Sequence, residues 1–169
     1  DTFEMLLGRG VCMEAKPFSI GVRIEHPQSL IDQTQYGRFA GHPQLGAADY
    51  KLVHHARSGR SAYTFCMCPG GQVIAASSEP GGIVTNGMSR YARSEANANS
   101  ALLVGVTPAD FGASGPLAGI AFQRQWEQKA FVLGGGGYVA PAQRVEDFLA
   151  GRPSLTMGRV AASYRPAVK

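Results

Sequence analysis

Apolar and polar residues alternate along residues 17–26, where Phe18, Ile20, Val22 and Ile24 are separated by polar or small residues. A period of two is typical of a β-strand with one buried face. Further short apolar runs lie between closely spaced glycine- and proline-rich turns, at residues 50–57, 61–68, 72–77, 83–85 and 102–106. Connections this short join antiparallel neighbours. The pattern predicts an antiparallel meander over residues 17–106, whose last strand is buried on both faces.

The hydrophobic period changes in the last third of the chain. Residues 117–133 carry apolar side chains at helical spacing, including Phe122 and Trp126, and the glycines at 134–137 end the run. We expect an amphipathic helix that packs against the sheet and buries Trp126, and therefore an α+β fold. Shorter helices are expected within residues 1–10, 27–32 and 145–149, and an extended tail over residues 151–169.

Composition and charge narrow the class of protein. The 169 residues are 44% hydrophobic, which suffices for the core of one globular domain. A net charge of +4, spread along the chain, is too small to indicate a nucleic-acid-binding protein. No apolar run has the length of a membrane-spanning helix, and the first residues lack the layout of a signal peptide. Three cysteines argue against a disulfide framework. We therefore expect a cytoplasmic protein without nucleic-acid or membrane partners.

The four glycines at residues 134–137 resemble a phosphate-binding loop only superficially. A dinucleotide-binding fingerprint requires a strand before its glycines and a helix that begins at the last of them. Here the order is reversed, because a predicted helix leads into the glycines. The run is interpreted as a helix end, and we expect no adenine dinucleotide to be held by this chain alone.

Cys66 and Cys68 are the most suggestive chemical groups. On a regular strand, residues at i and i+2 point to the same face. Strain disfavours a disulfide between them, and no second Cys/His pair has the spacing of a metal site, so we expect free thiols and no metal. Two interpretations remain open: a redox-active pair, or two small side chains buried as part of the core. No catalytic residue is identified, and Cys66 and Cys68 are the candidates.

Several segments together resemble a known family. They are residues 15–28, 45–52, 66–71, 78–79, 84–89, 97–101, 116–120 and 140–143. In these segments the chain resembles an uncharacterised family of bacterial FAD-dependent dehydrogenases within the flavoproteins that have two dinucleotide-binding folds. The resemblance covers nearly the whole chain.

The resemblance implies a role within a longer flavoprotein. Residues 1–169 would form a single inserted domain on the substrate side of the flavin, inactive alone, with residues 1–10 at the edge of the flavin-binding Rossmann domain of the same protein. That protein would be an FAD-dependent dehydrogenase acting on an unidentified small molecule. Residues expected to face the flavin or the cleft lie on two turns: Pro69, Gly70 and Gly71 on one, and Thr85, Asn86, Gly87 and Met88 on the other. A basic β-rich domain that binds RNA or another polyanion, and a structural domain that braces the flavin fold, remain alternatives.

Overall fold

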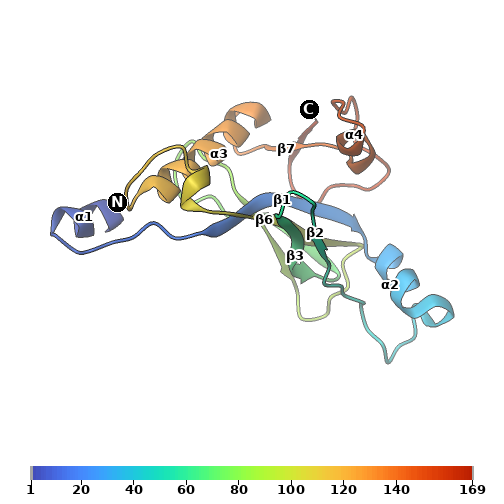
Figure 1. Cartoon of the computed structure of the whole chain (residues 1–169). Helices are drawn as coiled ribbons and strands as arrows, with labels where there is room; N and C mark the ends of the chain where they lie inside the picture. Colours follow the sequence, from blue (N-terminus) through green and yellow to red (C-terminus); the bar gives the residue numbers. More distant parts are fainter. Residues whose placement is uncertain (1, 169) are drawn as a thin grey trace.

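A four-stranded antiparallel sheet forms the centre of the protein, in a computed structural model that describes residues 2–168 (Figure 1). Its strand order is β1-β6-β3-β2, with β1 at Phe18–Pro27, β6 at Asn97–Val106, β3 at Ser61–Cys68 and β2 at Val53–His55. A separate antiparallel pair consists of β4 (Gly71–Ala75) and β5 (Thr85–Ser89). A short parallel pair consists of β7 (Ala140–Ala142) and β8 (Pro166–Val168).

Four α-helices complete the fold, which is α+β as the sequence predicts. They are α1 (Thr2–Gly8), α2 (Gln28–Tyr36), α3 (Ala118–Gly134) and α4 (Val145–Leu149), with 3-10 turns η1 at Gly37–Phe39 and η2 at Pro108–Asp110. The expected helix start at Asp1 and the end of the tail at Lys169 lie outside the described residues. None of the described helices is long and apolar enough to cross a membrane.

The alternating pattern of the first strand produces the longest pairing in the molecule. β1 and β6 pair without interruption from Phe18 opposite Val106 to Pro27 opposite Asn97. The prediction of an antiparallel sheet is confirmed, but the prediction of a meander is wrong. β3 contains a bulge between Phe65 and Cys68, after which the chain turns at Pro69 and Gly70 and leaves the sheet. Bulges bend the strand that contains them, so β4 and β5 form their own hairpin.

Helix α3 begins and ends almost where the pattern predicts. Its C-cap, Gly135, has a φ of 89°, a left-handed conformation that favours glycine. Phe122 of α3 contacts the core with its ring centroid 6.2 Å from Phe18 and 5.5 Å from Phe111, and Val106 and Ala118 are buried beside these rings. This cluster joins α3 to one end of the β1–β6 ribbon.

Trp126 is not buried, contrary to expectation. Trp126 is 46% exposed, although its ring packs edge-to-face against Phe122 and Lys129 lies over it at 4.6 Å. The strand at 102–106 is likewise not buried on both faces, since Leu102 and Gly105 are exposed. Both errors have one cause: α3 covers the sheet only near Phe18 and Val106, so the residues beyond that end remain open.

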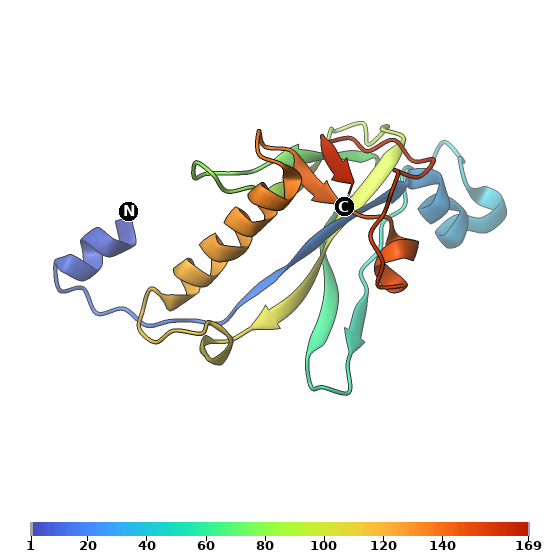
Figure 2. The same cartoon turned by 90° about the horizontal axis from the view of Figure 1, so that it is seen from above.

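The N-terminal helix lies away from the sheet, whereas the C-terminal tail contacts the rest of the fold. Helix α1 lies away from the sheet and is joined to β1 by an extended segment, while the turn end of the β2–β3 hairpin projects away from the rest of the chain (Figure 2). The expected extended tail is found only in part: residues 151–165 contain turns and bends, and only Pro166–Val168 forms a strand, which pairs with β7. Ser163 also anchors it: its hydroxyl donates to Glu25 at 2.5 Å, and it accepts the backbone N–H of Val73 at 2.8 Å.

Candidate functional site

A polar cluster lies where the β5 strand crosses the main sheet. Arg23, on β1, donates from Nη1 to Oδ1 of Asn99 on β6 at 2.8 Å. It also donates from Nη2 to Oδ1 of Asn86 on β5 at 3.0 Å. Asn99 is opposite Glu25 on β1 and opposite Cys68 on β3. The cluster therefore joins residues that are up to 76 positions apart in the sequence.

Gly87 allows β5 to approach this cluster. A Cβ atom at this position would lie 2.1 Å from Oδ1 of Asn99, 2.5 Å from Nη1 of Arg23 and 2.9 Å from Sγ of Cys68. Distances below 3.0 Å leave no room for a methyl group. A glycine is therefore required here by close approach, not by a turn conformation.

Two buried donors in the cluster have no hydrogen-bond partner among the described residues. They are Nε of Arg23 and Nδ2 of Asn99, and the Asn99 side chain is fully buried. Burial lowers the pKa of Arg23, while the nearby Cys68, Cys66 and Tyr50 act in the opposite direction. Buried polar groups are normally paired, so an exception requires an explanation.

Tyr50 and His26 lie close to the same cluster. The Tyr50 hydroxyl is 2.8 Å from Nε2 of His26, and their ring centroids are 5.6 Å apart. Burial raises the pKa of Tyr50, against the opposing effects of a hydrogen bond with Ser100 and of the Arg23 charge. A hydroxyl beside an imidazole can donate or accept a proton.

The two candidate cysteines have different environments. Cys66 lies in the β3 bulge with a φ of 49° and is exposed, whereas Cys68 is buried. Their predicted placement on one face is wrong, because the bulge interrupts the alternation of side chains between Phe65 and Cys68. All three cysteines are free thiols, and the Cys68 thiol donates to the Cys66 carbonyl at 3.4 Å.

Thiol labelling is expected to separate Cys66 from Cys68. Burial raises the pKa of the Cys68 thiol, so little reactive thiolate forms at neutral pH. In a Cys12→Ser variant, a maleimide should modify Cys66 quickly and Cys68 only after unfolding, as followed by mass spectrometry. A Cys12→Ser/Cys66→Ser variant is the control and should remain unlabelled while folded. Fast labelling of Cys68 in the native state would contradict this assignment.

The first predicted turn is buried and leads directly into β4, which begins at Gly71. Pro69, Gly70 and Gly71 are all buried, and the Gly70 N–H donates to Oε1 of Gln28 at 2.7 Å. Gly70 has a φ of 48°, and a Cβ there would lie 1.9 Å from the Arg93 carbonyl oxygen. This segment follows Cys68 directly in the chain, and its expected contact with a flavin remains a prediction.

The second predicted turn is a strand. Residues Thr85, Asn86, Gly87 and Met88 belong to β5 and pair with β4, so their assignment to a turn is wrong. An Asn-Gly pair is a frequent turn signal, but here Gly87 allows β5 to pack closely against Asn99 and Arg23. Asn86 and Met88 are exposed, whereas Thr85 and Gly87 are half-buried. Of the candidates from sequence, Asn86, Gly87 and Cys68 join the Arg23 cluster.

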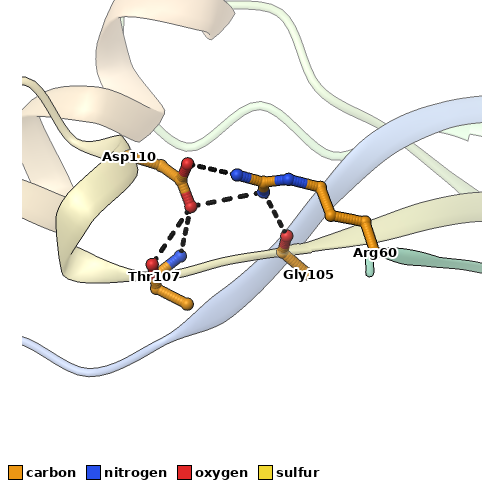
Figure 3. A network of polar contacts seen from close by, with 4 residues as sticks. All are labelled: Arg60, Gly105, Thr107 and Asp110. Atoms are coloured by element: carbon orange, nitrogen blue, oxygen red, sulfur yellow. Dashed lines mark hydrogen bonds and ion pairs between the residues drawn. The ribbon is translucent and has the colours of Figure 1, made fainter. Parts of the chain in front are cut away.

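A second polar network lies at the other end of β6 (Figure 3). Arg60 donates to Oδ2 of Asp110 at 3.3 Å and to the carbonyl oxygen of Gly105 at 2.9 Å, and it forms an ion pair with Oδ1 of Asp110. Asp110 also accepts the Thr107 N–H at 2.8 Å and caps η2. The hydrogen bonds from Arg60, followed by those from Thr107, lower the pKa of Asp110 from 3.8 to about 2.

This network predicts how the stability of the fold depends on pH. A carboxylate whose pKa is lower in the folded state stabilises the fold fully above its ordinary pKa of 3.8 and loses that effect as the pH falls through about 2. An NMR titration should find Asp110 ionised at pH values where exposed aspartates are already protonated. The Arg60→Gln variant should shift the Asp110 pKa back toward its ordinary value. An unchanged pKa in that variant would show that Arg60 is not the main cause.

No described part of the chain has the geometry that holds a dinucleotide. The glycines at 134–137 follow α3 and end it, so no strand leads through them into a helix. Helix α2 does follow β1 directly, but its N-cap is Pro27 and no glycine lies at the junction between the strand and the helix. Within residues 2–168 no three His, Cys, Asp or Glu side chains gather closely enough to hold a metal ion. The described residues therefore do not fit an FAD pyrophosphate.

Comparison with known proteins defines the family. Residues 17–169 match the family described as "FAD-dependent protein, C-terminal domain-like". The chain therefore belongs to this family of domains from FAD-dependent proteins. It is also 56% identical, over 165 residues, to an uncharacterised protein of Clostridium beijerinckii. The match covers 97% of this chain but only 31% of that relative.

Proposed function

We propose that this chain is the substrate-side domain of an FAD-dependent oxidoreductase of the dehydrogenase type, inactive alone and completed by a flavin-binding Rossmann domain in the same protein. In such an arrangement the flavin supplies the redox chemistry, and the protein binds and orients the substrate. Family membership supports the link to FAD. The lack of a dinucleotide-binding geometry in the described residues supports a separate flavin-binding domain.

The observation that carries this proposal is the large exposed surface of the chain. A folded monomer of 17.9 kDa has an accessible surface of about 8,000 Å². This chain has 11407 Å². Many of its large apolar side chains are exposed, among them Phe3, Met5 and Leu7 of α1. Such a surface is typical of a part that is covered in the complete protein.

One row of exposed apolar side chains crosses the main sheet. Val22 on β1 is opposite Leu102 on β6, which is opposite Thr64 on β3. The Leu52 carbonyl accepts the Thr64 N–H, and the Leu52 N–H donates to the Thr64 hydroxyl. Leu52 therefore lies beside Thr64 and extends the row. Val22 is 60% exposed and Leu52 62%. We assign this row, Val22, Leu102 and Leu52, to the contact with the flavin-binding domain, since most of the relative's chain lies outside the matched region.

Binding of RNA or another polyanion is less well supported. A polyanion-binding surface needs clustered basic side chains that are free to contact phosphates. Among the described residues, ion pairs with carboxylates instead engage five arginines: Arg60, Arg90, Arg124, Arg144 and Arg152.

The proposal is tested by flavin reduction in the full-length protein that contains this domain. The purified protein should be yellow, and a panel of candidate small molecules and nicotinamide cofactors is added under anaerobic conditions. We expect at least one compound to bleach the flavin absorbance and an added electron acceptor to restore it. A protein that binds no flavin, or a flavin that no compound reduces, would overturn the proposal.

A further inference from the structure

A pair of polar side chains borders the exposed row of Val22, Leu102 and Leu52. β1 alternates without interruption, so His26 lies on the same face of the sheet as Val22, four residues further along the strand. Tyr50 precedes Leu52 by two residues, and its hydroxyl lies 2.8 Å from Nε2 of His26. Both residues are half-buried. The pair therefore lies on the face that we assign to the flavin-binding domain, at one end of the row.

The sheet face is covered on both sides of the row. At one end Phe18 and Val106 belong to the apolar cluster that joins α3 to the sheet. At the other end Ala98, which is opposite His26, is fully buried. Val22 lies between these two parts and is largely exposed. A domain that docks on the row would enclose the open strip between them, and small-molecule sites are frequent at such domain interfaces.

The segment that carries Tyr50 is fixed by other contacts. Ala48 is buried, and its N–H donates to Oδ1 of Asp32 at 2.9 Å. Its carbonyl oxygen accepts from Nε2 of Gln28, also at 2.9 Å. Asp32 and Gln28 both belong to α2. The bond between Tyr50 and His26 is therefore not the only contact that positions this segment, as expected for a hydroxyl that is held in place for a function.

The hydrogen bonds of His26 define how the pair can transfer a proton. Nδ1 of His26 lies 3.4 Å from the carbonyl oxygen of Pro27, and a proton on Nδ1 leaves Nε2 as an acceptor for the Tyr50 hydroxyl. A phenol has one donor and two acceptor positions. The Tyr50 oxygen can therefore accept a proton from a bound molecule while it gives its own proton to Nε2.

We propose that Tyr50 is the catalytic proton acceptor for an alcohol substrate of the proposed enzyme, and that His26 takes the proton from Tyr50. The O–H bond of the alcohol breaks and its proton moves to Oη of Tyr50, while the Tyr50 proton moves to Nε2 of His26. The electron pair stays on the alcohol oxygen, which leaves an alkoxide beside an imidazolium. This inference rests on the proposed function, because the redox step itself belongs to the flavin of that enzyme.

The charge near Tyr50 favours an alcohol over an amine. Burial raises the pKa of Tyr50, whereas Ser100 and the positive charge of Arg23 act in the opposite direction. The same positive charge stabilises a forming alkoxide. It repels the ammonium group that an amine carries at neutral pH. We therefore assign the substrate to the alcohols, and an amine substrate is an outcome that the test below detects.

The test is anaerobic flavin reduction in the full-length protein that contains this domain, followed by stopped-flow absorbance. The probes are lactate, glycerol and benzyl alcohol, with benzylamine as the amine and NADH as a hydride donor that loses no oxygen-bound proton. We expect at least one of the alcohols to reduce the flavin. With that alcohol, Tyr50→Phe should lower the limiting rate constant by about 100-fold or more and change the half-saturating concentration by less than about threefold. Reduction by dithionite, which needs no substrate, should be unchanged in the variant.

Two further variants separate a catalytic role from a structural one. Tyr63→Phe is the matched control, because it removes a hydroxyl that bonds to Ser19 at 2.5 Å on the opposite face of the sheet. It should leave the rate constant unchanged. His26→Gln keeps a polar group near the position of Nε2 but cannot take up the proton, and should lower the rate constant by about tenfold or more. Each variant should retain the FAD content and the thermal unfolding temperature of the original protein.

Three results would overturn the inference: flavin reduction by none of the alcohols, equal rate constants in the original protein and in Tyr50→Phe, or an equal loss in Tyr63→Phe and Tyr50→Phe. Flavin reduction by benzylamine or NADH alone would leave the proposed function intact and contradict this inference. A full-length protein without flavin would overturn both.

Discussion

Replacing Gly87 with alanine is expected to reduce the free energy of unfolding by about 3 kcal/mol. The new methyl group would overlap Oδ1 of Asn99 and Nη1 of Arg23, at 2.1 and 2.5 Å. Asn99 is fully buried and cannot move aside, so its hydrogen bond with Arg23 must break or β5 must leave the sheet. Chemical denaturation followed by circular dichroism measures the loss directly.

Gly105→Ala is the matched control for this substitution. Gly105 is also a strand glycine without a left-handed φ, but a Cβ there meets nothing within 4 Å. Alanine should therefore change stability by no more than about 1 kcal/mol, and in the stabilising direction. Equal losses for Gly87→Ala and Gly105→Ala would mean that the close approach at Gly87 is not a structural requirement.

The Val22→Asp substitution is expected to disrupt the contact between this domain and the flavin-binding domain. Val22 is 60% exposed in the chain described here, so the new carboxylate remains solvated and the domain itself should keep its stability within about 0.5 kcal/mol. In the full-length protein, the same carboxylate would be buried without a partner, which costs several kcal/mol. We expect amide protection in β2 and β3 to fall by about 100-fold, as measured by hydrogen exchange.

Tyr91→Asp is the control for this experiment. Tyr91 is fully exposed and lies in a turn, away from the row of Val22, Leu102 and Leu52. Its substitution should leave exchange in β2 and β3 unchanged. If Val22→Asp also left exchange unchanged, the row would not be the contact surface.

The sequence predicts those elements whose pattern is local. The strict alternation from Phe18 to Ile24 predicts β1, and the run at Ser61–Cys68 predicts β3 with its observed bounds. The end of α3 follows from its glycines. What the pattern does not contain is the bulge after Phe65, which removes β4 and β5 from the main sheet. The exposure of Trp126 is also not local, because it depends on how little of the sheet α3 covers.

The sequence predicts the residues of the candidate site, like the fold, only in part. Cysteine and Asn-Gly chemistry indicates Cys66, Cys68, Asn86 and Gly87 as candidates, and Cys68, Asn86 and Gly87 do lie at the cluster. Arg23, Asn99, Tyr50 and His26 could not be found by spacing, because 76 positions separate Arg23 from Asn99 and 24 separate His26 from Tyr50. Arg23 occupies a polar position in an alternating strand, where an exposed side chain is the ordinary expectation. Only the pairing of β1 with β6 brings these groups together.

The most direct test of the account is the flavin content of two purified proteins, residues 1–169 alone and the full-length protein that contains them. We expect stoichiometric FAD on the full-length protein and none on the 169-residue chain, because the described residues offer no strand–glycine–helix site for the pyrophosphate. Absorbance of the released flavin gives both values. Stoichiometric FAD on residues 1–169, or a full-length protein without flavin, would contradict the account.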